Sequence, residues 1–123
     1  MPIDSFAGVL LISADAKSLR DFYVDVLQLP LEEESHEGVP LHYACNLGAC
    51  HFAIHPDEGW VGKPTKNAQS PVILFNSDDA QACADRLRAA GVDARGPYDH
   101  GFAQVVSFRD LDGNLVEILQ ANE

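Results

Sequence analysis

Several features of exported, disulfide-linked or membrane-spanning proteins are missing from the sequence. Its apolar runs, such as residues 6–12, are far shorter than the roughly 20 residues that a membrane-spanning helix needs. The opening residues MPIDSF do not form the basic region and apolar core of a secretory signal. The three cysteines are odd in number and lack CxxC spacing, which argues against a disulfide scaffold. We therefore expect a cytoplasmic protein that is not held in a membrane.

Basic residues are also scarce. Eight Lys and Arg stand against 19 Asp and Glu, which gives a formal net charge of −11. Nucleic acid and anionic membrane surfaces should be repelled, so neither is expected as a partner. Such a charge serves solubility, and it also suits a pocket that favours cationic ligands. Both interpretations stay open.

What the chain does contain is one pattern repeated twice. In each half an apolar strand is followed by an acid that can cap a helix, then by an amphipathic helix and further strands. The first half predicts strands at 6–13, 41–47 and 49–55, an extended segment at 31–38, and a helix after Asp15. The second half predicts strands at 72–76, 92–96, 103–110 and 114–120, and a helix capped by Ser77 or Asp78. The turns are placed at Leu47-Gly48 and at 112–114.

Matching positions in the two halves lie about 64 residues apart. Asp15 and Asp79 are 64 positions apart, and Gly48 and Gly113 are 65 apart. This spacing predicts an α+β protein of a single domain, with two βαβββ modules at residues 1–56 and 71–123 joined by a loop at 57–70. Each module has one helix for one sheet face. The other face must be buried against its twin or line a cavity.

Two motifs give these modules a family resemblance. The first is Asp15-x-x-Ser18-Leu19-x-x-Phe22-Tyr23. The second is Phe108-x-Asp110-x-Asp112-Gly113-Asn114-x-x-Glu117. In this order they resemble the vicinal oxygen chelate superfamily, which includes glyoxalase I, methylmalonyl-CoA epimerase, extradiol dioxygenases, and the fosfomycin- and bleomycin-resistance proteins. The resemblance implies modules that curl into a cup-shaped mixed sheet, often completed across a homodimer.

The resemblance also implies where a metal would be held. In metal-dependent members, His and Glu side chains from the first and last strand of each module bind a divalent ion such as Fe, Mn, Ni or Zn. The first-strand positions correspond here to Gly8 and Val72, which cannot act as ligands. The last-strand position of the second half is Glu117. Its counterpart in the first half is Phe52, with His51 and Ala53 one residue to either side.

Glu117 is the central candidate because a carboxylate is costly to bury without a partner. It could face water, recognise a cationic or hydrogen-bonding ligand, or bind a metal together with His51. Two ligands are too few for a catalytic site, although His42 or a partner chain could add a third. The sequence assigns no catalytic acid or base. The residues expected to contact a ligand are Glu117, Phe52, Trp60, Tyr98, His100 and Phe102.

Three of these positions also have plainer interpretations. Trp60 lies in a loop, where it could cap a ligand or anchor the loop, and Tyr98 and His100 could belong to an ordinary turn.

A two-residue turn at Leu47-Gly48 would place Cys45 opposite Cys50. We expect that pair to fill space in the core rather than to bind zinc.

Two functions of different class follow. The first is a metal-free protein, resembling the bleomycin-resistance group, that binds a small organic molecule; a cationic, antibiotic-like ligand fits best, and no cofactor is needed. The second is a divalent-metal-dependent lyase, isomerase or dioxygenase that uses Glu117 with one or more of His42, His51 and His55. The loss of ligands at Gly8 and Val72 favours the first.

Overall fold

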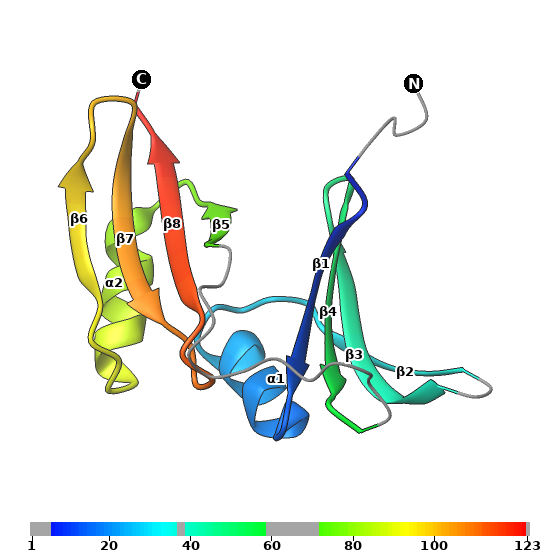
Figure 1. The fold of residues 1–123 in the computed structure, drawn as a ribbon. Coiled ribbons are helices and arrows are strands. Elements are labelled where there is room, and N and C mark those ends of the chain that lie inside the picture. The colour runs from blue at the N-terminus through cyan, green and yellow to red at the C-terminus, as the bar shows by residue number, and fades with distance from the viewer. Residues whose placement is uncertain (1–5, 37–38, 59–71, 123) are drawn as a thin grey trace. The chain divides into compact units, whose positions relative to one another are not determined.

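A computed structural model of the chain describes residues 6–36, 39–58 and 72–122. The chain divides into two compact units, Met1–Pro64 and Thr65–Glu123, which we call module 1 and module 2. Each has the element order βαβββ, so the predicted α+β repeat is confirmed (Figure 1). No helix in the described part of the chain has the length and apolar character needed to cross a membrane.

Module 1 is a four-stranded sheet with one helix. Its elements are β1 (Gly8–Ser13), α1 (Ala16–Asp25), β2 (Glu32–His36), β3 (Val39–Leu47) and β4 (Cys50–Pro56). The strand order is β1-β4-β3-β2. Strand β1 runs parallel to β4, whereas β3 is antiparallel to both of its neighbours. The first and last strands of the module therefore lie side by side.

Module 2 repeats this topology. Its elements are β5 (Ile73–Asn76), α2 (Ala80–Ala89), β6 (Arg95–Asp99), β7 (Ala103–Arg109) and β8 (Leu115–Ala121). The strand order is β5-β8-β7-β6, with β5 parallel to β8. The sequence places a strand at 92–96, but β6 begins three residues later. Residues Val92 and Ala94 instead belong to a tight connection in which the Ala94 N–H donates to the Val92 carbonyl at 2.9 Å.

An aspartate caps each helix. The Asp15 carboxylate accepts a hydrogen bond from the Ser18 N–H at 3.2 Å, and Asp79 accepts one from the Ala82 N–H at 3.0 Å. The prediction of Ser77 or Asp78 as the second cap is wrong by one or two residues. A capping side chain accepts a hydrogen bond from an N–H group in the first turn of the helix, and the Asp79 carboxylate does so at Ala82 of α2. The Ser77 hydroxyl instead accepts a hydrogen bond from the Asp79 N–H at 3.0 Å.

Each helix covers one face of its own sheet. In module 1 the ring of Tyr23 on α1 lies 5.1 Å from the ring of Phe52, centroid to centroid, and the Arg20 guanidinium lies over Tyr43. In module 2, Val116 and Ile118 of β8 are buried, and the Gln120 side chain accepts a hydrogen bond from the Ala80 N–H at 2.8 Å. Side chains alternate along a strand, so the intervening residues lie on the opposite face, which we call the helix-free face.

The β3–β4 turn differs from the prediction by one residue. Leu47 pairs with Cys50, so the turn residues are Gly48 and Ala49. Gly48 has a φ of 61°, and a positive φ favours glycine as the first of two turn residues. Cys45 consequently lies opposite Phe52, and the predicted Cys45–Cys50 pair does not form.

Candidate functional site

Glu117 lies on the helix-free face of module 2. Its neighbours Val116 and Ile118 are 0% and 3% exposed beneath α2, whereas Glu117 is half-buried on the other side of β8. The Ser107 hydroxyl, on the adjacent strand β7, donates a hydrogen bond to Glu117 Oε2 at 2.8 Å. A hydrogen bond of this length to a carboxylate fixes the side chain in one orientation.

The strand register puts Glu117 in a row of four residues that crosses the sheet. Leu74 pairs with Glu117, Glu117 pairs with Ser107, and Ser107 pairs with Arg95. Leu74 is 58% exposed, so an apolar surface adjoins the carboxylate. An ionised carboxylate can accept about four hydrogen bonds, and Ser107 supplies one. Glu117 can therefore accept a further hydrogen bond from a ligand that packs on Leu74.

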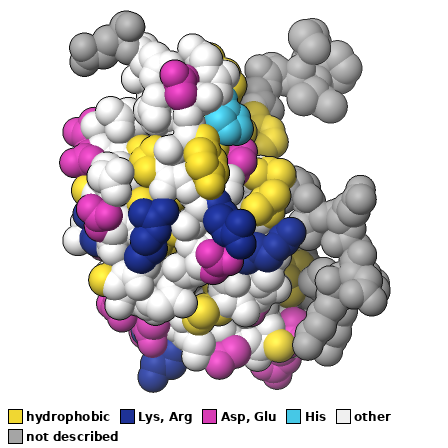
Figure 2. All heavy atoms as spheres, turned by 90° about the vertical axis from the view of Figure 1, so that its left-hand side faces the viewer, with side chains coloured by type: hydrophobic (Ala, Val, Ile, Leu, Met, Phe, Trp, Pro, Cys, Tyr) yellow, Lys and Arg dark blue, Asp and Glu magenta, His cyan; other side chains and the backbone are white. Residues whose placement is uncertain are grey.

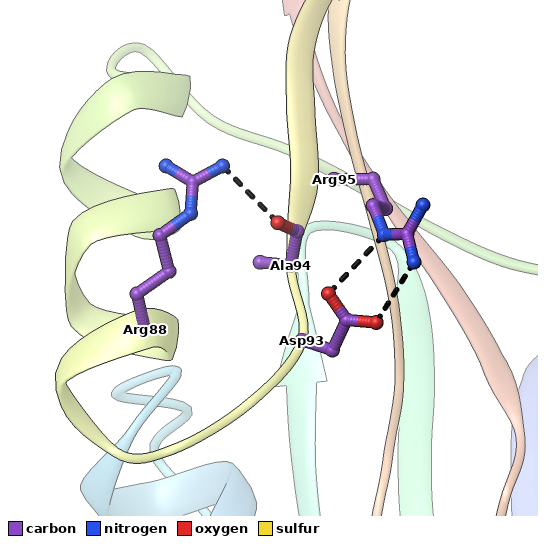
Figure 3. A network of polar contacts seen from close by, with 4 residues as sticks. All are labelled: Arg88, Asp93, Ala94 and Arg95. Carbon is purple, nitrogen blue, oxygen red and sulfur yellow. Dashed lines mark hydrogen bonds and ion pairs between the residues drawn. The ribbon is translucent and has the colours of Figure 1, made fainter.

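The arginines of module 2 are engaged elsewhere. Arg95 makes two hydrogen bonds of 3.1 Å to the Asp93 carboxylate, and Arg88 donates to the Ala94 carbonyl at 3.1 Å (Figure 3). The hydrogen bond and the charge of Arg95 lower the pKa of Asp93 below its ordinary value. Basic side chains form a band with acidic ones among them in the view of Figure 2. Within the described residues, no arginine pairs with Glu117, which leaves its charge available to a ligand.

Exposed aromatic side chains surround the β6–β7 hairpin. Tyr98 is 57% exposed and pairs with Val105, which lies on the same face as Ser107. Phe102 is 68% exposed and His100 is exposed in the hairpin turn. The structure thus brings three of the predicted contact residues together in one module with Glu117. Trp60 lies outside the described residues.

In module 1, backbone packing closes the first metal-ligand position. Gly8 pairs with His51 on the neighbouring strand, and a Cβ atom on Gly8 would overlap the carbonyl group of His51. The peptide of β4 therefore occupies the space that any side chain at this position would need. A histidine could not replace Gly8 without displacing one of the two strands.

The register also identifies the true counterpart of Glu117. In module 2, Glu117 pairs with Leu74, two residues after Val72. In module 1 the residue two positions after Gly8 is Leu10, and it pairs with Ala53. The counterpart is therefore Ala53, and the predicted match to Phe52 is wrong by one residue.

Phe52 and His51, the two residues that precede Ala53 on β4, have different surroundings. Phe52 faces α1, is 4% exposed and packs against Tyr23. His51 lies on the helix-free face and is exposed, and its Nδ1 atom is 3.0 Å from the Asn46 side-chain oxygen. His51 belongs to module 1 and Glu117 to module 2. The structure describes each residue within its own module, so their predicted pairing around a metal stays a prediction.

A pair of histidines occupies the helix-free face of module 1. The rings of His42 on β3 and His55 on β4 stack with their centroids 4.1 Å apart and their planes 13° apart. His42 is 4% exposed, with Nδ1 at 3.0 Å from the Pro40 carbonyl oxygen and Nε2 at 3.4 Å from Glu34 Oε2. Nitrogen lone pairs lie in the ring plane, so two stacked imidazoles cannot both point at one ion. Throughout the described ranges, no three His, Cys, Asp or Glu side chains gather in a way that could hold a metal.

Sequence reasoning missed two features of these faces. Counting across the predicted 112–114 turn would place Arg109 opposite Glu117, whereas in the structure Arg109 pairs with Leu115 and Ser107 pairs with Glu117. The His42–His55 stack likewise depends on the one-residue change in the β3–β4 turn.

Comparisons with known proteins agree with this geometry. A family model described as "Glyoxalase/Bleomycin resistance protein/Dioxygenase superfamily" matches residues 3–118. An uncharacterized protein of Shewanella frigidimarina (strain NCIMB 400) is 26% identical in an alignment that covers 97% of this chain and 95% of that protein.

Two solved structures share the fold. TnmS3, an antibiotic-binding protein from Streptomyces sp. CB03234, has a TM-score of 0.79 and 20% identity, with 99% of each chain covered. TioX from Micromonospora sp. ML1 has a TM-score of 0.72 and 20% identity, with 97% of this chain and 100% of that chain covered.

Proposed function

Because the chain belongs to the glyoxalase/bleomycin resistance protein/dioxygenase superfamily, we propose that it binds a small organic molecule without a metal ion. Glu117 and the exposed Leu74 and Tyr98 would contact this ligand on the helix-free face of module 2. The net charge of −11, and a Glu117 carboxylate that no arginine of the described residues pairs with, favour a ligand that carries a cationic or hydrogen-bond-donating group.

One observation carries this proposal: the four positions where the family places metal ligands hold only one side chain that could bind a metal. They are Gly8 and Ala53 in module 1 and Val72 and Glu117 in module 2. Together these four positions supply one carboxylate, that of Glu117. A catalytic metal usually takes three protein ligands, so these residues do not fit one.

The likeness to TnmS3 supports the choice of ligand class. That protein binds an antibiotic, and we extend this property to the present chain as part of the proposal. The ligand we expect is an antibiotic-like natural product with an apolar body to pack on Leu74 and a donor group to reach Glu117. A homodimer is part of the same proposal, and light scattering would test it.

Calorimetric titration of the full-length, metal-free protein tests the proposal. The probes are metal-free bleomycin and a panel of cationic, neutral and anionic natural products of similar size. We expect a cationic member to bind and Glu117→Gln to weaken its binding about tenfold or more, because a hydrogen bond to a charged group contributes about 1.5–3 kcal/mol.

Asp25→Asn is the matched control for this titration. Asp25 is exposed at the end of α1 in module 1, so the substitution changes the net charge equally without touching the site. Equal weakening by both variants would mean that only the overall charge matters. A panel in which no compound binds would overturn the proposed function.

A further inference from the structure

The row of residues that contains Glu117 ends in a charge of the opposite sign. Glu117 on β8 pairs with Ser107 on β7, and Ser107 pairs with Arg95 on β6. Paired residues of antiparallel strands share a face, so Arg95 lies on the helix-free face of module 2. In Figure 3 the Asp93–Arg95 pair lies on the side of β6 away from α2. The proposed function uses Glu117 and gives Arg95 no role.

Asp93 occupies only one edge of the Arg95 guanidinium. Its carboxylate oxygens accept hydrogen bonds of 3.1 Å from Nε and from Nη2. Among the described residues, Arg95 makes no other hydrogen bond or ion pair. A guanidinium has five N–H donors, so Nη1 keeps both of its N–H groups and Nη2 keeps one. These donors form an outer edge that matches the two oxygens of a carboxylate.

Tyr98 connects this outer edge with the proposed ligand site. The pKa of Arg95 is raised, chiefly by its hydrogen bond to Asp93 and by the charge of that carboxylate, and Tyr98 adds to the effect. Tyr98 therefore lies near the guanidinium. Its ring is 57% exposed, and the Arg95 side chain is 69% exposed. A ligand that contacts Tyr98 can therefore reach the free edge of Arg95.

The distance between the two charges suits a small molecule. Neighbouring strands lie about 4.8 Å apart, and one strand separates β8 from β6, so the backbones at Glu117 and Arg95 are about 10 Å apart. Between them lies Ser107, which is uncharged and donates its hydroxyl to Glu117. The row thus offers an acceptor at one end and a pair of N–H donors at the other.

We propose that the ligand is amphoteric: its cationic group binds Glu117, and its carboxylate binds the outer edge of Arg95 while Asp93 holds the other edge. This names the chemical class of the ligand and therefore rests on the proposed function. An amphoteric molecule also brings no net charge to a protein whose own net charge is −11, so it is repelled less than a simple anion.

Calorimetric titration of the full-length, metal-free protein with ciprofloxacin and with its methyl ester tests this class. Both compounds carry a cationic amine at one end of a rigid, largely apolar body, but only ciprofloxacin has a carboxylate at the other end. We expect the wild type to bind the acid about fivefold more tightly than the ester, because an exposed ion pair contributes modestly to affinity. Glu117→Gln should weaken the binding of both compounds.

Substitutions of Arg95 identify the group that recognises the carboxylate. Arg95→Gln should weaken binding of the acid until it equals that of the ester. Arg95→Lys keeps the charge but lacks the planar fork, so it should retain only part of the preference. Lys17→Gln is the matched control, because Lys17 is exposed on α1 of module 1 and the substitution removes the same charge away from the site. Its preference for the acid should remain about fivefold, as in the wild type.

The possible results separate this inference from the proposed function. Equal binding of acid and ester by the wild type, or a full preference in Arg95→Gln, would overturn the amphoteric ligand and leave the proposed function standing. The same holds if bleomycin or another member of the panel binds and ciprofloxacin does not. A protein that binds none of these compounds would overturn the proposed function and this inference with it.

Discussion

Ser107 on β7 donates a hydrogen bond to Glu117 on β8, with 2.8 Å between Ser107 Oγ and Glu117 Oε2. This contact holds the carboxylate on the helix-free face beside the exposed Leu74. It also explains how an acid is accommodated in the middle of a strand whose alternate residues are core. The half-buried charge has a partner and keeps acceptor capacity for a ligand.

Removal of that hydroxyl should weaken ligand binding without abolishing it. Ser107→Ala leaves Glu117 charged but less firmly oriented, so we expect an affinity loss of about fivefold, smaller than that of Glu117→Gln. Calorimetric titration with the cationic probe that binds the wild type measures both. An affinity equal to that of the wild type would show that Ser107 does not position the carboxylate.

Metal titration should give no specific binding. With Gly8, Ala53 and Val72 at the other family positions, Glu117 is the sole donor, and one carboxylate does not hold Mn²⁺, Fe²⁺, Ni²⁺ or Zn²⁺ tightly. Calorimetry of stripped wild-type protein and of Glu117→Gln should therefore give the same weak heats. Micromolar binding that Glu117→Gln removes would instead support the metal-dependent lyase, isomerase or dioxygenase.

Histidines introduced at the two first-strand positions should lower the free energy of unfolding by unequal amounts. Gly8→His must displace the His51 carbonyl and should lower the free energy of unfolding by about 2 kcal/mol or more. Val72→His, at the matching position of module 2, changes a residue that is 42% exposed and should cost less than about 0.5 kcal/mol. Urea unfolding of the two variants compares them. Equal costs would mean that β1 can move away from β4.

Asp110 should contribute strongly to stability. It is 5% exposed, and its carboxylate accepts hydrogen bonds from the Asp112 and Asn114 N–H groups and from the Asn114 side chain, at 2.9–3.0 Å. Asp110→Ala leaves these donors without their partner and should cost about 2–3 kcal/mol. Thermal unfolding measures this loss of stability. Asp112→Ala, which changes an exposed residue of the same turn, is the control and should have little effect on stability.

The cap of α1 should respond to acid. Hydrogen bonds from the Ser18 side chain, and then from its backbone N–H, lower the pKa of Asp15 below its ordinary value of 3.8. A carboxylate with a lowered pKa stabilises the fold above that value, and the contribution is lost as the pH falls below it. Asp15→Asn should therefore lower the urea midpoint slightly at neutral pH. The difference from the wild type should shrink below about pH 4, whereas a constant difference would contradict the assignment.

Much of the fold follows from short-range patterns in the sequence. The helix faces, the capping acid Asp15 and the turn glycines Gly48 and Gly113 all act on residues within a few positions, so spacing alone predicts them. The same holds for Glu117, because the motif fixes its distance from the turn. The sequence predicted the ends of the elements less accurately, as the second helix cap and the start of β6 show.

What the tertiary structure decided was register, since pairing between strands depends on contacts far apart in the sequence. One residue of difference in the β3–β4 turn separates Cys45 from Cys50 and brings His42 against His55. The parallel pairing of the first and last strands in each module makes Ala53, rather than Phe52, the counterpart of Glu117. A shift of one position moves every side chain of a strand to the opposite face. The sequence by itself determined two βαβββ modules with an acid in the closing strand, and only the paired strands determined which side chains share a face with that acid.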